Sequence, residues 1–360
     1  MKPEPPVRPS GGDVLGIRLP NPVGDVVAAI PFLAALRSHA SASRIFAYGS
    51  ENACKILEGL PHLDEQVALP AANLSGLRGV RSQAFVLRSR RTKRVFLLPN
   101  SWSSAAAACA ARVPVRIGRR ARGRAALLTQ ALPAIGAPRP MTELYLELLS
   151  PPAASSDPAS LPELAVLPLH AARAEARLAQ AAREGISPPF LAVAPGAAFG
   201  PSKIYPPHLL AKVLSEVRQE FGLTPLLLGS EAEAPLLAGL AARVGPPVLD
   251  TGTWPASLGE MKALLSRSEV LLAMDTGARH LAAALGIPQV VLYGPTDPRW
   301  SDFHLEKTLK LRGEGVSCSP CHLKRCPIDH RCLTGIPPAR VAAEVRLALD
   351  LRAAPAGVRA

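Results

Sequence analysis

Short apolar runs alternate with longer segments in which apolar residues recur every three to four positions, and this pattern continues along the chain. The short runs are typical of buried strands and the longer segments of amphipathic helices. The pattern predicts strands at 14–19, 44–48, 95–98, 190–194, 224–228, 248–250, 270–274 and 289–293. It predicts helices at 25–38, 51–57, 104–112, 142–149, 170–183 and 338–351. Such alternation is the signature of doubly wound α/β sheets.

A stretch rich in Pro, Ala and Ser at 151–164 lacks any periodicity and divides the pattern into two halves of similar size. We therefore predict two Rossmann-like domains, 1–165 and 166–360, with 151–164 as the linker. Residues 1–12 and the tail at 352–360 are predicted to be disordered. Ligands of such folds bind outside the carboxyl ends of the strands, so we expect the site in a cleft between the two domains.

Composition narrows the class of protein. With 48% hydrophobic and 19% charged residues, the chain is globular, and no apolar run approaches the length of a membrane span. The first residues lack a secretory pattern, so we expect a cytoplasmic protein. The net charge of +13 indicates an anionic partner: nucleic acid, an acidic membrane surface or a phosphorylated substrate. Aromatic residues make up only 4%, which argues against a base-stacking single-strand binder.

The segment AMDTGARHLAAALG carries a strand directly into a helix. There the backbone N–H groups of Thr276 and Gly277, together with the helix dipole, suit a phosphate. His280 lies in the first turn, where it is either neutral or beside a bound anion. The alternative is an ordinary turn with Asp275 as the helix cap.

Two further charged residues follow strands in the second half. Lys203, in PGAAFGPSK, suits a diphosphate, although the spacing differs from that of a phosphate-binding ATPase loop. Glu231 follows the strand TPLLLGS and suits ribose hydroxyls. Each has a simpler interpretation, as a solvated lysine and as an exposed glutamate at a helix start. Neither D-x-D nor G-x-G-x-x-G occurs, which favours a metal-independent transferase over a metal-dependent one or a dehydrogenase.

A basic run and a cysteine cluster are two further motifs. The run RIGRRARGR holds five arginines, which form either a clamp for acceptor carboxylates or phosphates or a solvated loop. The clamp residues would be Arg116, Arg119, Arg120 and Arg124. Four close cysteines near the end suggest a structural zinc site, with reactive or packed thiols as the alternative. These are Cys318, Cys321, Cys326 and Cys332.

An acidic residue also follows the first strand. In RLPNPVGDVV the carboxylate of Asp25 occupies a strand-to-helix turn of the kind that usually holds an anion. We expect the helix dipole to lower the pKa of Asp25 and keep it ionised. The plain alternative is a first-turn acid that only offsets the dipole. A nucleotide-binding or nucleic-acid-binding module without transferase activity is the competing hypothesis for the whole chain.

Taken together, the motifs resemble glycosyltransferase family 9, the heptosyltransferases of lipopolysaccharide core assembly, and within it the heptosyltransferase II branch. The resemblance is carried along nearly the whole chain by NPVGDVVAAIPFLAALR, LLPNSWSSA, RIGRRARGRAALLT, PGAAFGPSKIYP, DTGARHLAAALGIPQVVLYGPTDP and CSPCHLKRC. It implies a GT-B fold, with the acceptor bound mainly by the first domain and the nucleotide sugar by the second. Ala198, Ile204 and Tyr205 depart from the usual pattern of the family.

The resemblance also implies roles for single residues. Asp25 matches the catalytic base, Lys203 a lysine at the diphosphate and sugar, Glu231 a glutamate at the ribose, and 275–280 the D-T-G-x-x-H donor signature. Gly196 and Phe199 belong to the donor motif around the lysine. The implied partners are ADP-heptose and an anionic lipid-linked saccharide at the inner membrane, not nucleic acid. Neither cofactor nor metal is implied for the transfer, which inverts the anomeric centre.

Overall fold

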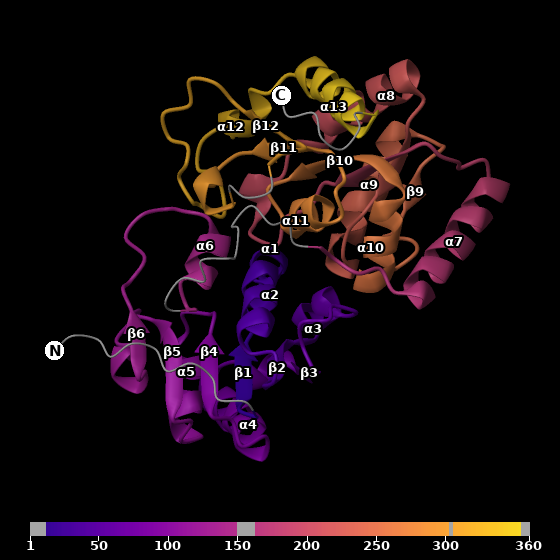
Figure 1. Ribbon diagram of the computed structural model, residues 1–360. Helices are drawn as coiled ribbons and strands as arrows, with labels where there is room; N and C mark the ends of the chain where they lie inside the picture. The colour runs from indigo at the N-terminus through magenta and orange to yellow at the C-terminus, as the bar shows by residue number, and fades with distance from the viewer. Residues whose placement is uncertain (1–11, 150–162, 302–304, 354–360) are drawn as a thin grey trace. The chain divides into compact units, whose positions relative to one another are not determined.

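The computed structural model describes residues 12–149, 163–301 and 305–353. The chain divides into two compact units (Figure 1). Unit 1 is Met1–Ala165 with Arg299–Phe303, and unit 2 is Val166–Pro298 with His304–Ala360. Most of the disorder predicted at 1–12 and 352–360 and of the linker predicted at 151–164 lies outside the described residues. The tail prediction was wrong at 352 and 353, which belong to the last helix of the chain.

Unit 1 contains a six-stranded parallel sheet in the order β3-β2-β1-β4-β5-β6. Its strands are β1 (Val14–Arg18), β2 (Arg44–Ser50), β3 (Glu65–Leu69), β4 (Arg94–Leu97), β5 (Val115–Arg119) and β6 (Gln130–Leu132). The chain moves outward from β1 through β2 to β3, and then returns to β4 on the other side of β1. The order therefore reverses beside β1, which is where open α/β sheets bind their ligands.

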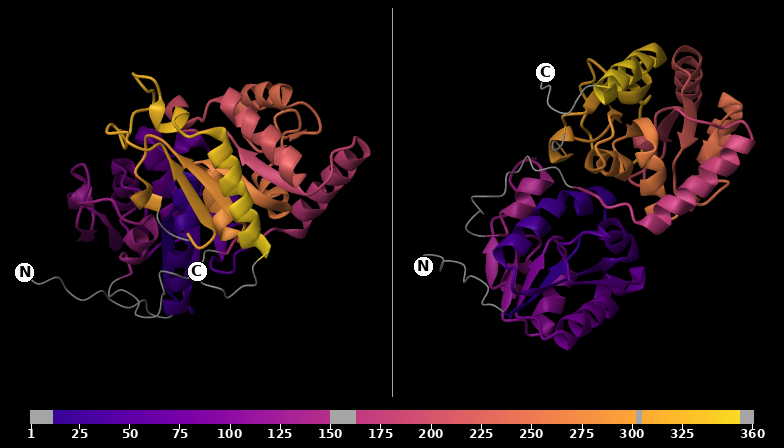
Figure 2. Two further views of the ribbon diagram at one scale, coloured as in Figure 1. Left: turned by 90° about the horizontal axis from the view of Figure 1, so that it is seen from above. Right: turned by 45° about the vertical axis from the view of Figure 1, so that its right-hand side comes forward.

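Helices cover both faces of this sheet (Figure 2). They are α1 (Val23–Ala28), α2 (Ile30–His39), α3 (Glu51–Leu57), α4 (Gly76–Ser89), α5 (Trp102–Ala110) and α6 (Met141–Leu146). The single helix predicted at 25–38 is instead the pair α1 and α2, which divide at Ala29. Pro31 explains the division, because it has no N–H with which to continue the hydrogen bonding of α1.

Unit 2 repeats the arrangement with the order β12-β11-β10-β7-β8-β9. Its strands are β7 (Phe190–Ala194), β8 (Thr224–Leu227), β9 (Leu249–Asp250), β10 (Ser268–Met274), β11 (Gln289–Tyr293) and β12 (Thr308–Arg312). Strands β7 and β10 are buried along almost their whole length and pair in parallel at the centre. The loops that leave the carboxyl ends of these two strands are therefore neighbours, although about 80 residues separate the strands in the sequence.

The helices of unit 2 are α7 (Pro168–Arg183), α8 (Pro207–Phe221), α9 (Ala234–Val244), α10 (Leu258–Ser266), α11 (Gly277–Ala284), α12 (Arg331–Thr334) and α13 (Pro338–Ala353). Strands β7, β10 and β11 pack on α8 and α13 to form one hydrophobic core. Within the described part of the chain, no helix has the length and apolar character needed to cross a bilayer.

The two predicted doubly wound sheets are confirmed, but several elements were missed. Strands β3, β5, β6 and β12 were not predicted, and neither was α4. The interpretation of RIGRRARGR as a solvated loop was wrong, because Arg116 to Arg119 belong to β5 and Arg124 is buried. Edge and near-edge strands carry more charged residues than central ones, so the apolar pattern that reveals a buried strand is weak there.

Candidate active site

Asp25 is the third residue of α1 and follows β1 at the point where the strand order of unit 1 reverses. Burial raises the pKa of the Asp25 carboxyl from its ordinary value to about 6. The expectation that the helix dipole lowers this pKa was therefore wrong. Helix α1 has only six residues, and the loss of hydration at a crowded turn outweighs the dipole of so short a helix.

A tyrosine and an arginine shape the surroundings of this turn. Tyr145 of α6 is buried, and its pKa is raised well above the ordinary value by burial and by the negative charge of Asp25, so the phenol is neutral. Arg18, at the end of β1, donates from Nε to Gln83 Oε1 at 3.1 Å and from NH2 to Asn21 Oδ1 at 3.2 Å. It also donates to the Leu19 carbonyl. Arg18 thus fixes the loop that leads to Asp25.

The loops after β7 and β10 meet through an ion pair in unit 2. Lys203 Nζ donates to Asp275 Oδ2 at 2.7 Å and to the Asp275 carbonyl at 2.8 Å. The same Oδ2 accepts from Thr296 Oγ1 at 2.6 Å, and Oδ1 lies 3.4 Å from Arg279 Nε. Lys203 and Asp275 were predicted separately, and the fold brings them into contact. Thr296 and Arg279 were missed, because nothing in the local sequence marks them.

The charges of this cluster leave it suited to an anion. Burial favours the neutral form of Asp275, but the charges of Lys203 and Arg279 and the hydrogen bonds from Lys203 and Thr296 together lower its pKa. Two cations therefore face one carboxylate. An ammonium group has three protons, and two of those on Lys203 are used by Asp275, so one remains for a ligand.

Helix α11 begins beside this ion pair. Thr276 is its N-cap residue, in an extended conformation and without a side-chain hydrogen bond to the helix. The first backbone N–H groups of a helix have no acceptor within it, so the amides from Gly277 onward add to the anion-binding character of the turn. His280, the fourth residue of α11, is buried. The sequence had marked this turn correctly as a strand-to-helix junction.

The remaining predicted donor residues lie on neighbouring loops. The ring of Phe199 has its centroid 5.2 Å from Lys203 Nζ, a cation–π contact. Glu231 is exposed in the turn that follows β8, the strand beside β7. A side chain at Gly196 would overlap the carboxylate of Glu233. Glu233, which the sequence analysis missed, also accepts from the N–H and Oγ of Ser230 and so holds the turn that carries Glu231.

The cysteine-containing segment packs against the loop that carries Lys203. Ser202 Oγ donates to the Leu323 carbonyl at 2.5 Å, and Ser202 N donates to the Lys324 carbonyl at 3.2 Å. His330 Nε2 lies 2.6 Å from the Ser202 carbonyl, which can only accept, so this nitrogen carries the proton. At Gly200 φ is 148°, and a Cβ there would lie 2.7 Å from the Lys324 carbonyl. The cysteine-containing segment thus holds the backbone of the Lys203 loop in place through its contacts with Ser202 and Gly200.

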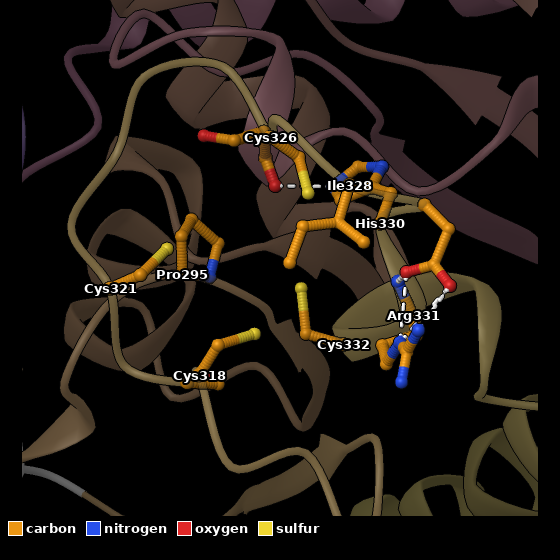
Figure 3. Close-up of a pocket in the computed structure, with 11 residues that line it drawn as sticks. Pro295, Cys318, Cys321, Cys326, Ile328, His330, Arg331 and Cys332 are labelled. Atoms are coloured by element: carbon orange, nitrogen blue, oxygen red, sulfur yellow. Dashed lines mark hydrogen bonds and ion pairs between the residues drawn. The ribbon is translucent and has the colours of Figure 1, made fainter.

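The four cysteines line a small pocket in this segment (Figure 3). Its lining includes Cys318, Cys321, Cys326 and Cys332, together with His330 and Pro295. In the described parts of the chain, no three His, Cys, Asp or Glu side chains are arranged to hold a metal ion. All four cysteines are free thiols. The zinc site therefore stays a prediction from the spacing.

The arginines proposed as an acceptor clamp differ in their surroundings. Arg119 is buried and paired with Glu147, and Arg124 is completely buried. Arg116 is half-buried and donates to the carbonyls of Leu127 and Val113. Arg120 is exposed. The side chains of Arg119 and Arg124 thus bind groups of unit 1 itself.

Arg124 supports the loop between β4 and α5. It donates to the carbonyls of Arg119, Pro99 and Ser101 at 2.8, 2.6 and 3.0 Å. Burial lowers its pKa to about 10, so it stays charged at neutral pH. We expect Arg124→Ala to reduce the free energy of unfolding by about 3 kcal/mol, because several buried acceptors lose a charged donor. Denaturant titration measures this loss.

The matched control is Arg120→Ala, which removes an exposed arginine from the same run. It should change the free energy of unfolding by less than about 0.5 kcal/mol. Equal stability losses in the two variants would contradict the structural role given to Arg124.

Comparisons with known proteins agree with this architecture. The model of glycosyltransferase family 9 (heptosyltransferase) matches residues 81–331. Lipopolysaccharide heptosyltransferase 2 of Salmonella typhimurium LT2 is 30% identical over 257 residues, covering 68% of this chain and 72% of that protein. A family 9 glycosyltransferase of Veillonella parvula superposes with a TM-score of 0.81 at 18% identity, covering 96% of this chain and 100% of that one. E. coli ADP-heptose LPS heptosyltransferase II gives 0.74 at 23% identity, covering 95% and 100%.

The two parallel six-stranded sheets with their flanking helices place the chain in the GT-B-like class, as the resemblance implied. The chain belongs to glycosyltransferase family 9, the heptosyltransferase family. The family match sets aside the hypothesis of a binding module without transferase activity.

Proposed function

We propose that this glycosyltransferase moves a heptose from ADP-heptose to the inner core of lipopolysaccharide, carried by an anionic lipid-linked acceptor. The names of its relatives support this donor and acceptor. The observation that carries the proposal is the Lys203–Asp275 ion pair beside the start of α11. It gives a nucleotide diphosphate a cation and free backbone amides in one place. We propose the cytoplasm as the place of this reaction.

In this proposal, residues 166–360 form the donor-binding domain. The diphosphate binds to Lys203 and to the amides at Thr276 and Gly277, with His280 beside them. Glu231 accepts hydrogen bonds from the ribose hydroxyls, and Gly196 leaves room for Glu233 to hold the Glu231 turn. The ring of Phe199 packs beside Lys203 and restricts the conformations that the lysine side chain can adopt. The charge that develops on ADP as it leaves is met by these groups, so the transfer needs no metal.

Residues 1–165 then form the acceptor-binding domain. Asp25 takes the proton from an acceptor hydroxyl while the oxygen of that hydroxyl attacks the anomeric carbon. The bond from this carbon to the ADP oxygen breaks as the new glycosidic bond forms. Attack opposite the leaving group inverts the anomeric centre. A base with a pKa near 6 is ionised at neutral pH and still basic enough to accept the proton.

The anionic acceptor needs cationic partners in the same domain. Of the arginines first considered, Arg120 is exposed and Arg116 is partly accessible. We assign direct acceptor contact to these two. Arg119 and Arg124 contribute by holding the backbone that carries them, since their own donors are used within unit 1.

The experiment that tests the donor is a mass-spectrometric screen of nucleotide sugars with a lipopolysaccharide-core acceptor, which identifies the released nucleotide and the extended product. We expect ADP release coupled to heptose addition, with the transfer rate unchanged by a chelator. Release of UDP or GDP with another sugar would instead support the alternative, a family 9 transferase with a different donor.

A further inference from the structure

Helix α4 carries the most exposed large hydrophobic side chains in the described part of the chain. Leu77 is 79% exposed and Phe85 is 72% exposed. Both lie on the outer face of unit 1, and the proposed transfer reaction uses neither. Single exposed hydrophobics are ordinary on protein surfaces, so their surroundings on the helix decide whether they matter.

Arginines lie on the same face as these two side chains. At 100° per residue, Leu77, Arg78, Arg81, Phe85 and Arg88 fall within about a quarter of the helix circumference. All five are exposed. Helix α4 contains no acidic residue, and among the described residues no ion pair involves Arg78 or Arg81. This group of five residues, the α4 face, is therefore both apolar and strongly cationic.

The opposite side of the helix fixes this orientation. Ala84, Val86 and Leu87 are buried, and the last two belong to the hydrophobic core of unit 1. Gln83 is fully buried, where it accepts from Arg18 and donates from Nε2 to the Leu74 carbonyl at 3.2 Å. Arg88 donates to the Ala110 carbonyl of α5. A buried hydrogen bond thus joins α4 to Arg18, at the end of the strand that leads to Asp25.

We propose that the α4 face docks on an anionic lipid bilayer. The arginines attract the negative surface, and Leu77 and Phe85 enter the boundary between headgroups and acyl chains, as on interfacial amphipathic helices. Charge complementarity alone would also suit nucleic acid, but phosphate backbones offer nothing to two exposed apolar side chains. The inference deepens the proposed function, because a lipid-linked acceptor lies at such a surface. The α4 face is separate from Arg116 and Arg120, to which direct acceptor contact is assigned above.

Vesicle co-sedimentation of the full-length protein tests this inference. We expect binding to vesicles of phosphatidylglycerol and phosphatidylethanolamine and little binding to phosphatidylcholine. Each arginine near an anionic surface contributes about fivefold to partitioning, so Arg78→Glu with Arg81→Glu should reduce it at least about 25-fold. Leu77→Ser with Phe85→Ser should reduce it at least about tenfold, and the loss should persist at high salt.

Matched controls separate this surface from net charge and general hydrophobicity. Arg173→Glu with Arg183→Glu makes the same charge change on exposed positions of α7, and Leu169→Ser with Leu347→Ser removes two other exposed leucines. Both control proteins should bind vesicles like the original. Equal losses in the charge variants would overturn the proposal, as would vesicle binding unaffected by Leu77→Ser with Phe85→Ser, or comparable α4-dependent binding to duplex DNA.

An activity assay on the same proteins tests the transferase proposal separately. With a delipidated, soluble core acceptor, all four double variants should transfer heptose at the original rate. Loss of vesicle binding with full soluble-acceptor activity supports the docking face. Absence of heptose transfer in every protein, with vesicle binding as expected, would remove the proposed function and leave the docking face standing.

Discussion

Replacement of Asp25 by Asn is expected to lower the rate of sugar transfer by about 10² to 10⁴, the usual contribution of a general base. The amide has nearly the shape of the carboxyl group but cannot accept the acceptor's proton. Donor binding belongs to unit 2 in this account, so the ADP dissociation constant should stay within about twofold of the original. Product formation and isothermal titration with ADP measure the two effects.

The same substitution should make the protein more stable at pH 8. The pKa of Asp25 is about 6 in the folded protein and about 4 in the unfolded chain. Between these values the folded state binds more protons, so this carboxyl's stabilising contribution is complete below pH 4 and is lost as the pH rises through 6. At pH 8 the ionised, half-buried carboxylate costs about 2–3 kcal/mol, which an uncharged amide avoids. Denaturant titration at pH 8 and at pH 4 should show a gain only at the higher pH.

These two results together distinguish a base from a helix-capping acid. If Asp25 only offsets the dipole of α1, Asp25→Asn should destabilise the protein slightly and leave turnover intact. Glu163→Gln, at an exposed glutamate of unit 1, is the control and should change neither quantity. Turnover retained in Asp25→Asn would remove Asp25 from the mechanism.

Lys203→Ala is expected to lower kcat/KM by about 10² to 10³, the effect of removing one preorganised donor from a developing negative charge. The ADP dissociation constant should rise by at least about tenfold, because a charge-assisted contact is lost. Arg279 and Thr296 remain as partners of Asp275, so the fold should survive. Steady-state kinetics and calorimetry with ADP provide both measurements.

Lys212→Ala is the matched control, since Lys212 is an exposed lysine on α8. It should leave kcat/KM and ADP binding unchanged. Unaltered ADP affinity in Lys203→Ala would show that the lysine serves only the Asp275 ion pair, and the donor site would then have to lie elsewhere in unit 2.

The sequence predicted the central elements because buried parallel strands are continuous apolar runs. Strands β7 and β11 have the predicted bounds. The missed strands β3 and β12 lie at sheet edges, and β3 is only partly buried, so polar residues interrupt their pattern. Helix α4 was missed because its exposed face mixes Leu77 and Phe85 with arginines, which weakens the usual apolar stripe.

For the candidate site, the sequence identified residues next to strand ends but not their partners. Contact between Lys203 and Asp275 depends on the pairing of β7 with β10, which no local pattern encodes. The pKa of Asp25 was predicted in the wrong direction, because burial is a property of the folded surroundings while the helix start is visible in the sequence. The sequence analysis made Arg124 a candidate for acceptor contact, but its side chain is completely buried. An arginine in a basic run need not lie at the surface.

The most direct test of the central claim, that Asp25 is the base, is the single-turnover rate of transfer as a function of pH with saturating donor and a soluble core acceptor. The account predicts a rate that falls about tenfold per pH unit below an inflection near pH 6, and a residual rate without this inflection in Asp25→Asn. The same inflection in both proteins would contradict it.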